Sequence, residues 1–218
     1  EGEGRGARMT TMEVTPVEDV ERACGTLLAA FHDSSANDFL NCKFQDVPLE
    51  ETLASHSRAD ELTRNTIMFY VDRGAEFVQT GDYATVAIWT VPHKHVAVDR
   101  TKDERFNAVF LDESQRVKER VIPQGMQYYY LFMVGRDPVS AVKGSVRALF
   151  DHYIERANRE NVALVLEAIS DHARDVYEHF GFVNYNTFKY GVGEVDSNGH
   201  LDSNGDGHTG YLMIYLPK

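Results

Sequence analysis

Apolar residues recur every three or four positions in the first third of the chain, which is the period of a helix with one buried face. The clearest run lies between residues 18 and 31, after a short strand predicted at 11–15, and its apolar members are Val20, Cys24, Leu27, Leu28 and Phe31. A second helix is predicted over residues 49–73, where Gly74 can end it.

The pattern then changes to that of strands and back again. Residues 76–80 and 84–90 read as two strands, and Gly81-Asp82 between them favours a hairpin. Residues 101–120 are highly charged, with apolar residues at helical intervals, and predict an exposed helix or a pair of helices. This segment is compatible with an interaction helix, although a solvated charged face explains it equally well.

Strand and helix periods alternate in the second half of the chain. The predicted elements are a strand at 127–134, a helix at 142–157, a strand at 162–169, a short helix at 171–180, and strands at 182–190 and 211–216. A strand, a helix and a strand in succession make a parallel βαβ unit, whereas the earlier hairpin is antiparallel. The sequence therefore predicts an α/β fold with a mixed sheet and helices on both faces. The polar residues 191–210 predict a long mobile hairpin loop.

Composition and charge narrow the possible partners. The 218 residues are 43% hydrophobic and 26% charged, which suits one large domain with a real core. A net charge of −12 argues against nucleic acid, because phosphate binding needs clustered Lys and Arg. No run reaches the roughly 18 apolar residues that a membrane helix needs, so no membrane partner is expected. Cys24 and Cys42 make no disulfide framework, and a cytoplasmic location is the expectation.

A strand that runs through a loop into a helix offers candidate chemistry. Residues 128–138 lead toward a helix that begins near Gly144. A turn at a helix N-terminus presents unpaired N–H groups and the positive end of the helix dipole, and a Gly there lets a phosphate approach closely. The pattern predicts a phosphate site, although a Gly before a helix is also an ordinary structural choice.

This stretch and the elements after it resemble the cofactor-binding core of the GNAT superfamily of N-acetyltransferases. The matching residues are Val134-Gly135, Pro138, Lys143-Gly144, Leu166-Glu167, Tyr177-Glu178 and Gly181-Phe182. Within the superfamily the pattern is most similar to the puromycin N-acetyltransferase-like branch, which residues 85–92 and 27–31 also resemble. The resemblance implies a centrally splayed sheet and one domain over residues 9–218, with a cofactor-binding core at about 127–190. Residues 1–8 are interpreted as a disordered leader or the remnant of an expression tag.

The resemblance also implies acetyl-CoA as donor, bound where two parallel strands splay apart, and an amine of a small molecule as acceptor. Backbone groups of Met133, Val134 and Gly135 would hold the pantetheine and polarise the thioester carbonyl. The pyrophosphate would lie on the loop formed by Ala141, Val142, Lys143, Gly144, Ser145 and Val146. A drug-like amine, a polyamine, an amino acid and a secondary metabolite all stay open as acceptors, and a homodimer is compatible with the sequence.

Two side chains are predicted to carry the proton transfers of this reaction. Tyr177 would protonate the departing CoA thiolate, and Glu167 would receive the proton of the amine directly or through water. Each has a structural alternative, Tyr177 as a packing residue and Glu167 as half of a buried ion pair. His172 and His179 flank the site as alternative bases, although lone histidines are more often surface residues.

Three positions depart from the family pattern. The phosphate loop normally opens with Gln or Arg, where this chain has Ala141, and closes with Gly or Ala, where it has the β-branched Val146. Ala173 stands where the family usually has an Asn that contacts the cofactor. The alternative hypothesis is a GNAT fold with a degenerate CoA site that binds a small molecule or catalyses a different reaction in the same cleft.

Aromatic residues supply candidates for the acceptor pocket, and no metal site is expected. Phe31, Phe39 and Trp89 are predicted to line the pocket, with core packing as the alternative for Phe31 and Trp89. Asp202-Ser-Asn204-Gly-Asp206-Gly207 copies the opening of a calcium-binding EF-hand loop, but the twelfth position is Met213 in place of Glu. A polar hairpin loop explains that segment better.

Overall fold

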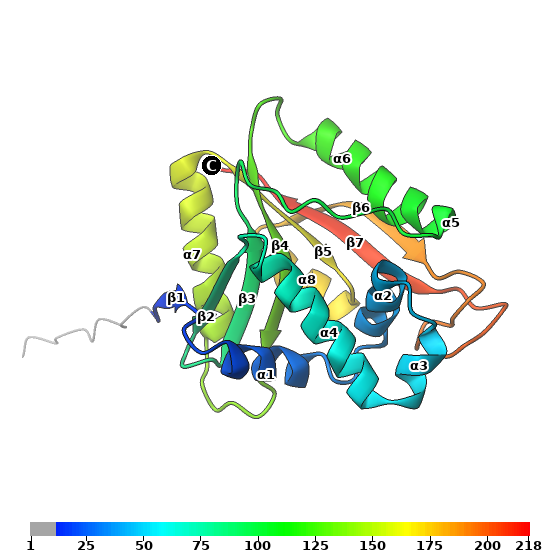
Figure 1. Cartoon of the computed structure of the whole chain (residues 1–218). Coiled ribbons are helices and arrows are strands. Elements are labelled where there is room, and N and C mark those ends of the chain that lie inside the picture. The colour runs from blue at the N-terminus through cyan, green and yellow to red at the C-terminus, as the bar shows by residue number, and fades with distance from the viewer. Residues whose placement is uncertain (1–11) are drawn as a thin grey trace, which may run out of the picture.

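The computed structural model describes residues 12–218, so the predicted leader at 1–8 lies outside the described residues (Figure 1). Its strands are β1 (Val14–Pro16), β2 (Glu76–Thr80), β3 (Thr85–Thr90), β4 (Tyr128–Arg136), β5 (Ala163–Ala168), β6 (Val183–Tyr190) and β7 (His208–Tyr215). Its helices are α1 (Val20–Ala30), α2 (Ser35–Gln45), α3 (Leu49–Ala54), α4 (His56–Val71), α5 (Glu104–Phe106), the π-helical η1 (Asn107–Asp112), α6 (Glu113–Val121), α7 (Ser145–Glu160) and α8 (Asp171–His179).

All the strands join one sheet in the order β1-β2-β3-β4-β5-β7-β6. The pairing of β4 with β5 is parallel and the other pairings are antiparallel. Helix α7 connects the two parallel strands, because a parallel connection needs a long crossover. The predicted mixed sheet, βαβ unit and early hairpin are confirmed.

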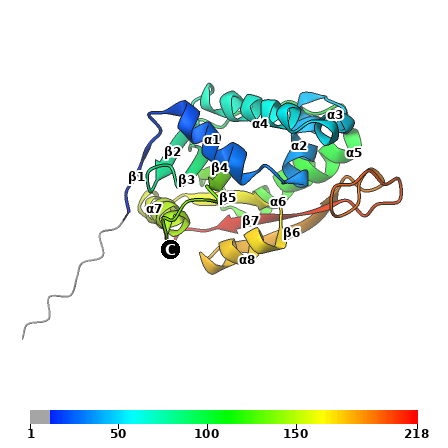
Figure 2. The same cartoon turned by 90° about the horizontal axis from the view of Figure 1, so that it is seen from below.

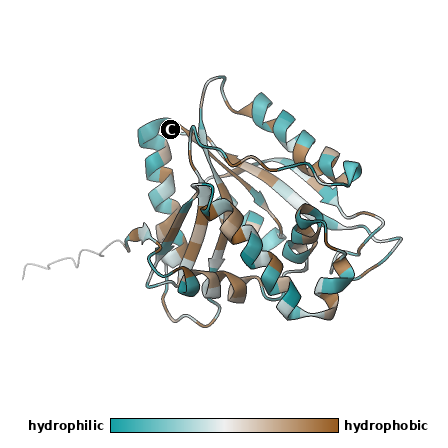
Figure 3. Cartoon of the chain, viewed as in Figure 1, coloured by the Kyte–Doolittle hydropathy of each residue, from teal (hydrophilic) through white to brown (hydrophobic). Residues whose placement is uncertain are grey.

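Helices cover both faces of the sheet, as predicted (Figure 2). Helices α1 to α6 lie on one face, which we call the upper face, and α7 and α8 lie on the other, the lower face. The apolar side chains of the strands fill the space on both sides, and the outer surface of α6 is mostly hydrophilic (Figure 3). Burial of this apolar area is the main favourable term in folding. No helix within residues 12–218 has both the length and the apolar character to cross a membrane.

The sheet opens between its two parallel strands. Pairing of β4 with β5 ends at Leu131 and Leu166, while β4 continues to Arg136 along β3. A β-bulge places one extra residue, Phe132, between the β4 residues that face Ile88 and Trp89. Such a bulge bends a strand and re-aims its side chains. The two strands therefore diverge just beyond Leu131, which agrees with the predicted central splay.

Helix α2 was not predicted, because two polar residues interrupt the apolar pattern of its buried face. Asn37 and Asn41 are buried and both donate hydrogen bonds to Thr63 Oγ1 of α4, at 3.1 and 3.2 Å. Ser34 caps the helix by accepting from the N–H of Asn37. Buried amides that are satisfied in this way look like surface residues in the sequence, so they obscure the helical period of Ala36, Phe39 and Cys42.

The predicted helix at 49–73 is two helices. Ser55 has an extended backbone between them, and its hydroxyl accepts from the N–H of Arg58 to begin α4. Serine is a favoured N-cap for this reason. The last strand also begins earlier than predicted, at His208, because the residues before Tyr211 pair with β6.

Candidate functional site

The residues of β4 beyond the bulge divide between the two faces of the sheet. Met133 and Gly135 belong to the upper face, under α1, and Val134 packs on the core of the lower face. A Cβ on Gly135 would lie 2.7 Å from the Cβ of Ala30 and 3.1 Å from Leu27 Cδ2. Glycine is therefore required here so that α1 can approach the strand. The backbone of these β4 residues borders the opening between β4 and β5.

The start of α7 is a helix N-terminus with unpaired N–H groups. Gly144 has a left-handed backbone with φ 82°, and a Cβ there would meet nothing within 4 Å, so the space beside it is open. The N–H groups of Ser145, Val146 and Arg147 have no acceptor among residues 12–218, because the first bond of the helix joins Ala148 N to Gly144 O. Free N–H groups at the positive end of a 16-residue helix suit a phosphate group.

This terminus is fixed from both sides. Buried Ser145 Oγ lies 2.7 Å from Thr85 Oγ1 of β3, which ties the first turn of α7 to the sheet. Arg136 Nη2 donates to the carbonyls of Ser140 and Val142, at 3.0 and 2.9 Å, and closes the loop before the helix. Lys143 is exposed and forms no ion pair with a described residue. A preorganised loop with a free cation can hold a polyanion.

The three departures from the family pattern have different surroundings. Ala141 is exposed at the loop, so the chain lacks a polar side chain at that position. Val146 and Ala173 are half-buried and pack on the hydrophobic core of the lower face. The β-branched side chain of Val146 therefore contributes to the core between α7 and the sheet.

Glu167 is the first residue of β5 beyond its last pairing with β4. Its carboxylate accepts a hydrogen bond from the hydroxyl of Tyr130, and no described Lys, Arg or His forms an ion pair with it. The structural alternative of a buried ion pair is therefore not formed within residues 12–218. Burial raises the pKa of Glu167, although the bond from Tyr130 and the charge of Lys118 oppose the shift. A carboxyl group with a raised pKa is suited to proton transfer.

Aromatic side chains that the sequence did not single out surround this carboxylate. Tyr70 of α4 stacks on Phe132 with ring centroids 3.8 Å apart, and Tyr190 comes from β6. Burial, together with the negative charge of Glu167, raises the pKa of both Tyr70 and Tyr190. Tyr190 pairs with His208 of β7, and Glu167 pairs with Leu212 of the same strand. Tyr70 and Tyr190 belong to elements that are far from Glu167 in the sequence, and no motif in the sequence marks either tyrosine as a site residue.

Two buried polar atoms near these tyrosines have no hydrogen-bond partner among residues 12–218. They are the hydroxyl of Tyr190 and Nε2 of His208, whose ring centroids are 5.4 Å apart. Burial lowers the pKa of His208, so its ring is kept neutral. Unpaired buried groups are costly and rare, and a bound water, ion or ligand can complete their bonding.

Tyr177 lies on the lower face, on α8. Its ring is half-buried and packs against Phe150 and Phe182, with centroid distances of 5.3 and 6.2 Å. Its hydroxyl forms no hydrogen bond with a described residue, and burial raises its pKa to about 12. The phenol keeps its proton at neutral pH and can donate it. The alternative bases His172 and His179 are exposed on the same helix.

The three predicted pocket residues are not brought together. Phe31 is half-buried beside Gly135, and Phe39 is buried against Tyr190 and His208, at 5.8 and 5.7 Å between ring centroids. Trp89 is fully buried on the lower face and stacks on Tyr153 at 4.1 Å. The predicted pocket role of Trp89 is therefore corrected, because its side chain points into the core under α7.

The loop that resembles an EF-hand is stabilised by its own backbone. Asp202 Oδ1 accepts from the N–H of Asn204 at 2.9 Å, and Gly207 N donates to Val195 O at 2.9 Å. Within residues 12–218, no three His, Cys, Asp or Glu side chains are arranged to hold a metal ion.

Comparisons with known proteins identify the family. A family model described as the YOR012W acetyl transferase domain matches residues 15–95. The chain is 42% identical to the protein YDR391C of Saccharomyces cerevisiae, over 98% of this chain and 90% of that protein. It is 24% identical to the N-acetyltransferase C550.08 of Schizosaccharomyces pombe, over 76% of this chain and 71% of that protein. Its fold is similar to that of a solved Corynebacterium glutamicum structure described as histone acetyltransferase HPA2 and related acetyltransferase, with a TM-score of 0.55, 20% identity, and 96% and 98% of the two chains covered.

The chain belongs to the GNAT superfamily of N-acetyltransferases. Two separate parts of the sequence each resemble this superfamily. The family model covers the region from β1 through β3, whereas the motif resemblance lies in residues 128–182. The puromycin N-acetyltransferase-like branch stays a prediction.

GNAT membership gives the geometry a common interpretation. The opening between β4 and β5, the free N–H groups of α7 and the carboxylate of Glu167 are the features that an acyl-transfer site of this superfamily would use. Ala141 is the departure that removes a side chain from this site, because Val146 and Ala173 pack on the core.

Proposed function

We propose that this GNAT N-acetyltransferase transfers the acetyl group of acetyl-CoA to a primary amine of a small molecule, with Glu167 as base. The observation that carries the proposal is the position of Glu167. It lies at the opening of the sheet, has a raised pKa, and is bonded by Tyr130 without an opposing cation. Such a group can take a proton from an ammonium at neutral pH.

The residues at the start of α7 fit the cofactor that the family implies. Acetyl-CoA would supply the acetyl group as a thioester. The N–H groups of Ser145, Val146 and Arg147, with the exposed cation of Lys143, would hold its pyrophosphate. The backbone of Met133, Val134 and Gly135 would hold the pantetheine and place the carbonyl in the opening. Positioning of this kind supplies much of the rate in two-substrate reactions.

Protons then move in two places. Glu167 takes one proton from the incoming ammonium, so that the neutral amine nitrogen can form the new C–N bond as the C–S bond breaks. Tyr177 would give its proton to the leaving sulfur. The acylated nitrogen would then lose its second proton to solvent, from which Tyr177 regains one, and Glu167 would release its own proton to solvent. The raised pKa of Tyr177, about 12, means that it is protonated at the start of each turnover. Phe31 and Phe39 would contact the acceptor on the upper face.

Two measurements test this proposal. Isothermal calorimetry should show acetyl-CoA binding, and mass spectrometry should then detect acetylated products from a panel of primary amines. Absence of binding at millimolar acetyl-CoA would contradict the proposal and favour a GNAT fold with a degenerate CoA site. Binding of acetyl-CoA without transfer to any amine would support the cofactor site and contradict a small-molecule amine as the acceptor.

A further inference from the structure

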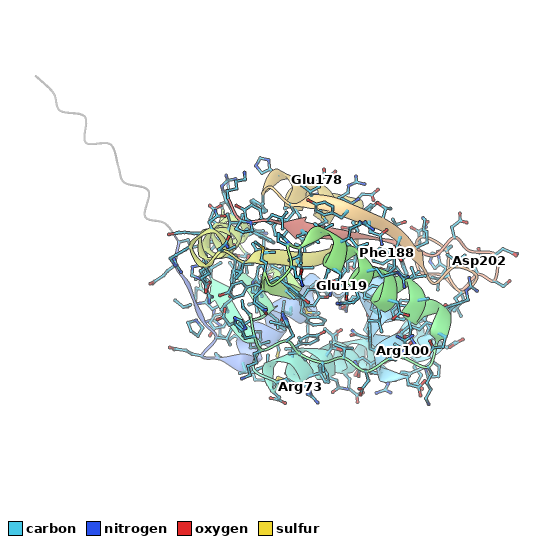
Figure 4. All side chains as sticks on the ribbon, turned by 90° about the horizontal axis from the view of Figure 1, so that it is seen from above. Arg73, Arg100, Glu119, Glu178, Phe188 and Asp202 are labelled. Carbon is cyan, nitrogen blue, oxygen red and sulfur yellow. The ribbon has the colours of Figure 1, made fainter. Side chains whose placement is uncertain are left out.

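A large cavity lies on the upper face, at the end of the molecule that carries the β6–β7 loop. Its volume is about 950 Å³, it is open to solvent on one side, and it is bordered by α2, the turn that follows α2, the starts of α3 and α5, and the β6–β7 loop. Figure 4 shows this end from above, with Arg100 on the segment leading to α5 and Asp202 in the β6–β7 loop. Its carboxylates are Asp46, Glu50, Asp103, Glu104 and Glu194.

The charge of the lining is negative even after its internal ion pairs are counted. Lys43 and Lys102 are the lining cations, against five carboxylates, which leaves a net charge of −3 on the lining itself. One of the five, Glu104, also pairs with Arg100 just outside the lining, at 2.8 Å. Lys102 pairs with exposed Asp46. Glu50 has no hydrogen-bond or ion-pair partner among residues 12–218. A cleft lined by one sign of charge concentrates ligands of the opposite sign.

One ammonium group already occupies the inner wall of this cavity. Lys43 Nζ lies 2.8 Å from Asp103 Oδ2, 2.6 Å from Glu194 Oε1 and 5.2 Å from the ring centroid of Phe39. Its side chain is only 18% exposed. Two carboxylates and an aromatic face are the groups that bind organic cations. The wall is thus built to stabilise positive charge.

Phe39 connects the cavity with the reacting carboxylate. It lines the cavity and also contacts Tyr190 and His208, whose buried polar atoms have no partner among residues 12–218. Tyr190 pairs with His208 of β7, and Glu167 pairs with Leu212 farther along the same strand. The unpaired hydroxyl and ring nitrogen therefore lie between the β6–β7 loop, which borders the cavity, and the part of β7 that pairs with Glu167.

We propose that the acidic cavity binds the far end of the acceptor, and that this end carries a second positive charge. The acceptor is then a diamine or a larger polyamine, acetylated at one nitrogen and held through another. This rests on the proposed function for the reacting amine. A carboxylate at the far end would be repelled by Glu50 and its neighbours, so amino acids are disfavoured.

Three amines with the same methylene spacer test this selectivity. Cadaverine ends in a second ammonium, hexylamine in a methyl group and aminocaproate in a carboxylate. We expect kcat/KM for acetylation to fall in that order, and the KM for cadaverine alone to rise with added salt, since screening weakens ionic attraction. Spermidine, with a longer spacing of charges, serves as a second cationic probe. Equal kcat/KM for the cationic and the neutral amines would overturn the proposal.

Variants locate the effect. Glu50→Gln removes a carboxylate without a partner, and Glu194→Gln removes one of the two that bind Lys43. Each should raise the KM for cadaverine by about two- to fivefold and leave hexylamine unchanged, a size typical of one exposed charge pair. Glu155→Gln, on the outer face of α7, is the matched control and should change neither. A parallel change for cadaverine and hexylamine would overturn the proposal.

Calorimetry separates this inference from the proposed reaction. Cadaverine or spermidine should bind the protein without acetyl-CoA, and binding should weaken in Glu50→Gln/Glu194→Gln. If no amine is acetylated but this binding is seen, the cation-binding role of the cavity is supported and the proposed acetyl transfer is contradicted. If amines are acetylated but neither cation binds or is preferred, the reaction stands and the cavity is wrong.

Discussion

The hydroxyl of Tyr130 donates a hydrogen bond to the carboxylate of Glu167, and the two residues belong to the parallel strands that separate just beyond them. Tyr130 pairs with Val165 in the sheet, and the pairing ends one residue later at Leu131 and Leu166. The bond therefore spans the closed end of the opening. It holds the carboxylate in place without a cation nearby. A cation in that position would lower the pKa of Glu167.

Replacement of Glu167 by Gln should separate activity from stability. We expect kcat/KM to fall about a hundredfold or more, the usual loss for a general base. In the wild type the rate should rise with pH through the raised pKa of Glu167, and this limb should disappear in the variant. The pH profile of kcat/KM is the measurement, and an unchanged profile removes Glu167 from the mechanism.

The same variant should be no less stable. Burial raises the folded-state pKa of Glu167 above its unfolded value, so its favourable contribution is present at low pH and is lost as pH rises through that pKa. Gln does not ionise and keeps an acceptor for Tyr130. The melting temperature of Glu167→Gln should equal the wild-type value in acid and exceed it at neutral pH. A lower value at neutral pH would show that the carboxylate has a structural role.

Replacement of Tyr177 by Phe tests the acid. The ring packing against Phe150 and Phe182 is kept, and the lost hydroxyl has no partner among residues 12–218, so stability should change by less than about 0.5 kcal/mol. Turnover should fall by about a hundredfold, with acetyl-CoA affinity unchanged. Single-turnover kinetics measure the rate of acetyl transfer, and calorimetry measures the affinity for acetyl-CoA. An unchanged rate would leave Tyr177 as a packing residue.

The sequence predicted the second half of the fold well because its elements are long and strongly periodic. Helix α7 buries Leu149, Phe150, Tyr153 and Ala157, which is the spacing seen in the sequence. Helix α2 was missed because Asn37 and Asn41 face α4 and look like surface residues. A single sequence does not reveal that two amides share one buried hydroxyl.

The candidate site divides in the same way. Glu167, Tyr177 and the Gly144 turn lie in one continuous stretch with a recognisable pattern. Tyr70, Tyr190 and His208 come from α4, β6 and β7, and only the sheet topology places β7 beside β5 and β6 beyond β7. Trp89 was assigned to the pocket because aromatic residues favour both pockets and cores, and the sequence does not tell which face of a fully buried strand it occupies.

The bridge between Thr85 and Ser145 should control cofactor affinity by fixing the first turn of α7. Ser145→Ala leaves the buried Thr85 hydroxyl unpaired and should cost about 1–3 kcal/mol of stability. It should also weaken acetyl-CoA binding, because the first turn of α7 loses its attachment to β3. The double variant Thr85→Val/Ser145→Ala should recover much of the stability. Denaturant unfolding of the three variants measures the coupling, and additive losses would show that the bridge is not formed.

The altered loop positions should respond differently to repair. Ala141→Arg adds a cation at an exposed position and should tighten acetyl-CoA binding by about two- to fivefold at low salt. Val146→Ala should give no such gain and should cost about 1 kcal/mol of stability, because Val146 packs on the core. Calorimetry at two salt concentrations distinguishes them. Tighter binding by Val146→Ala would mean that the valine obstructs the phosphates.

Trp89 is the single tryptophan of the chain, so its fluorescence tests where it lies. Its side chain is fully buried, stacks on Tyr153 and lies under α7 on the lower face. Glu167 lies on the upper face. Its emission should be blue-shifted, should not respond to saturating amine, and should shift to the red only on unfolding. Trp89→Phe should leave the KM for amines unchanged, whereas Phe39→Ala should raise it, since Phe39 contacts Tyr190 and His208. A change in emission on adding amine without acetyl-CoA would place Trp89 at the acceptor after all.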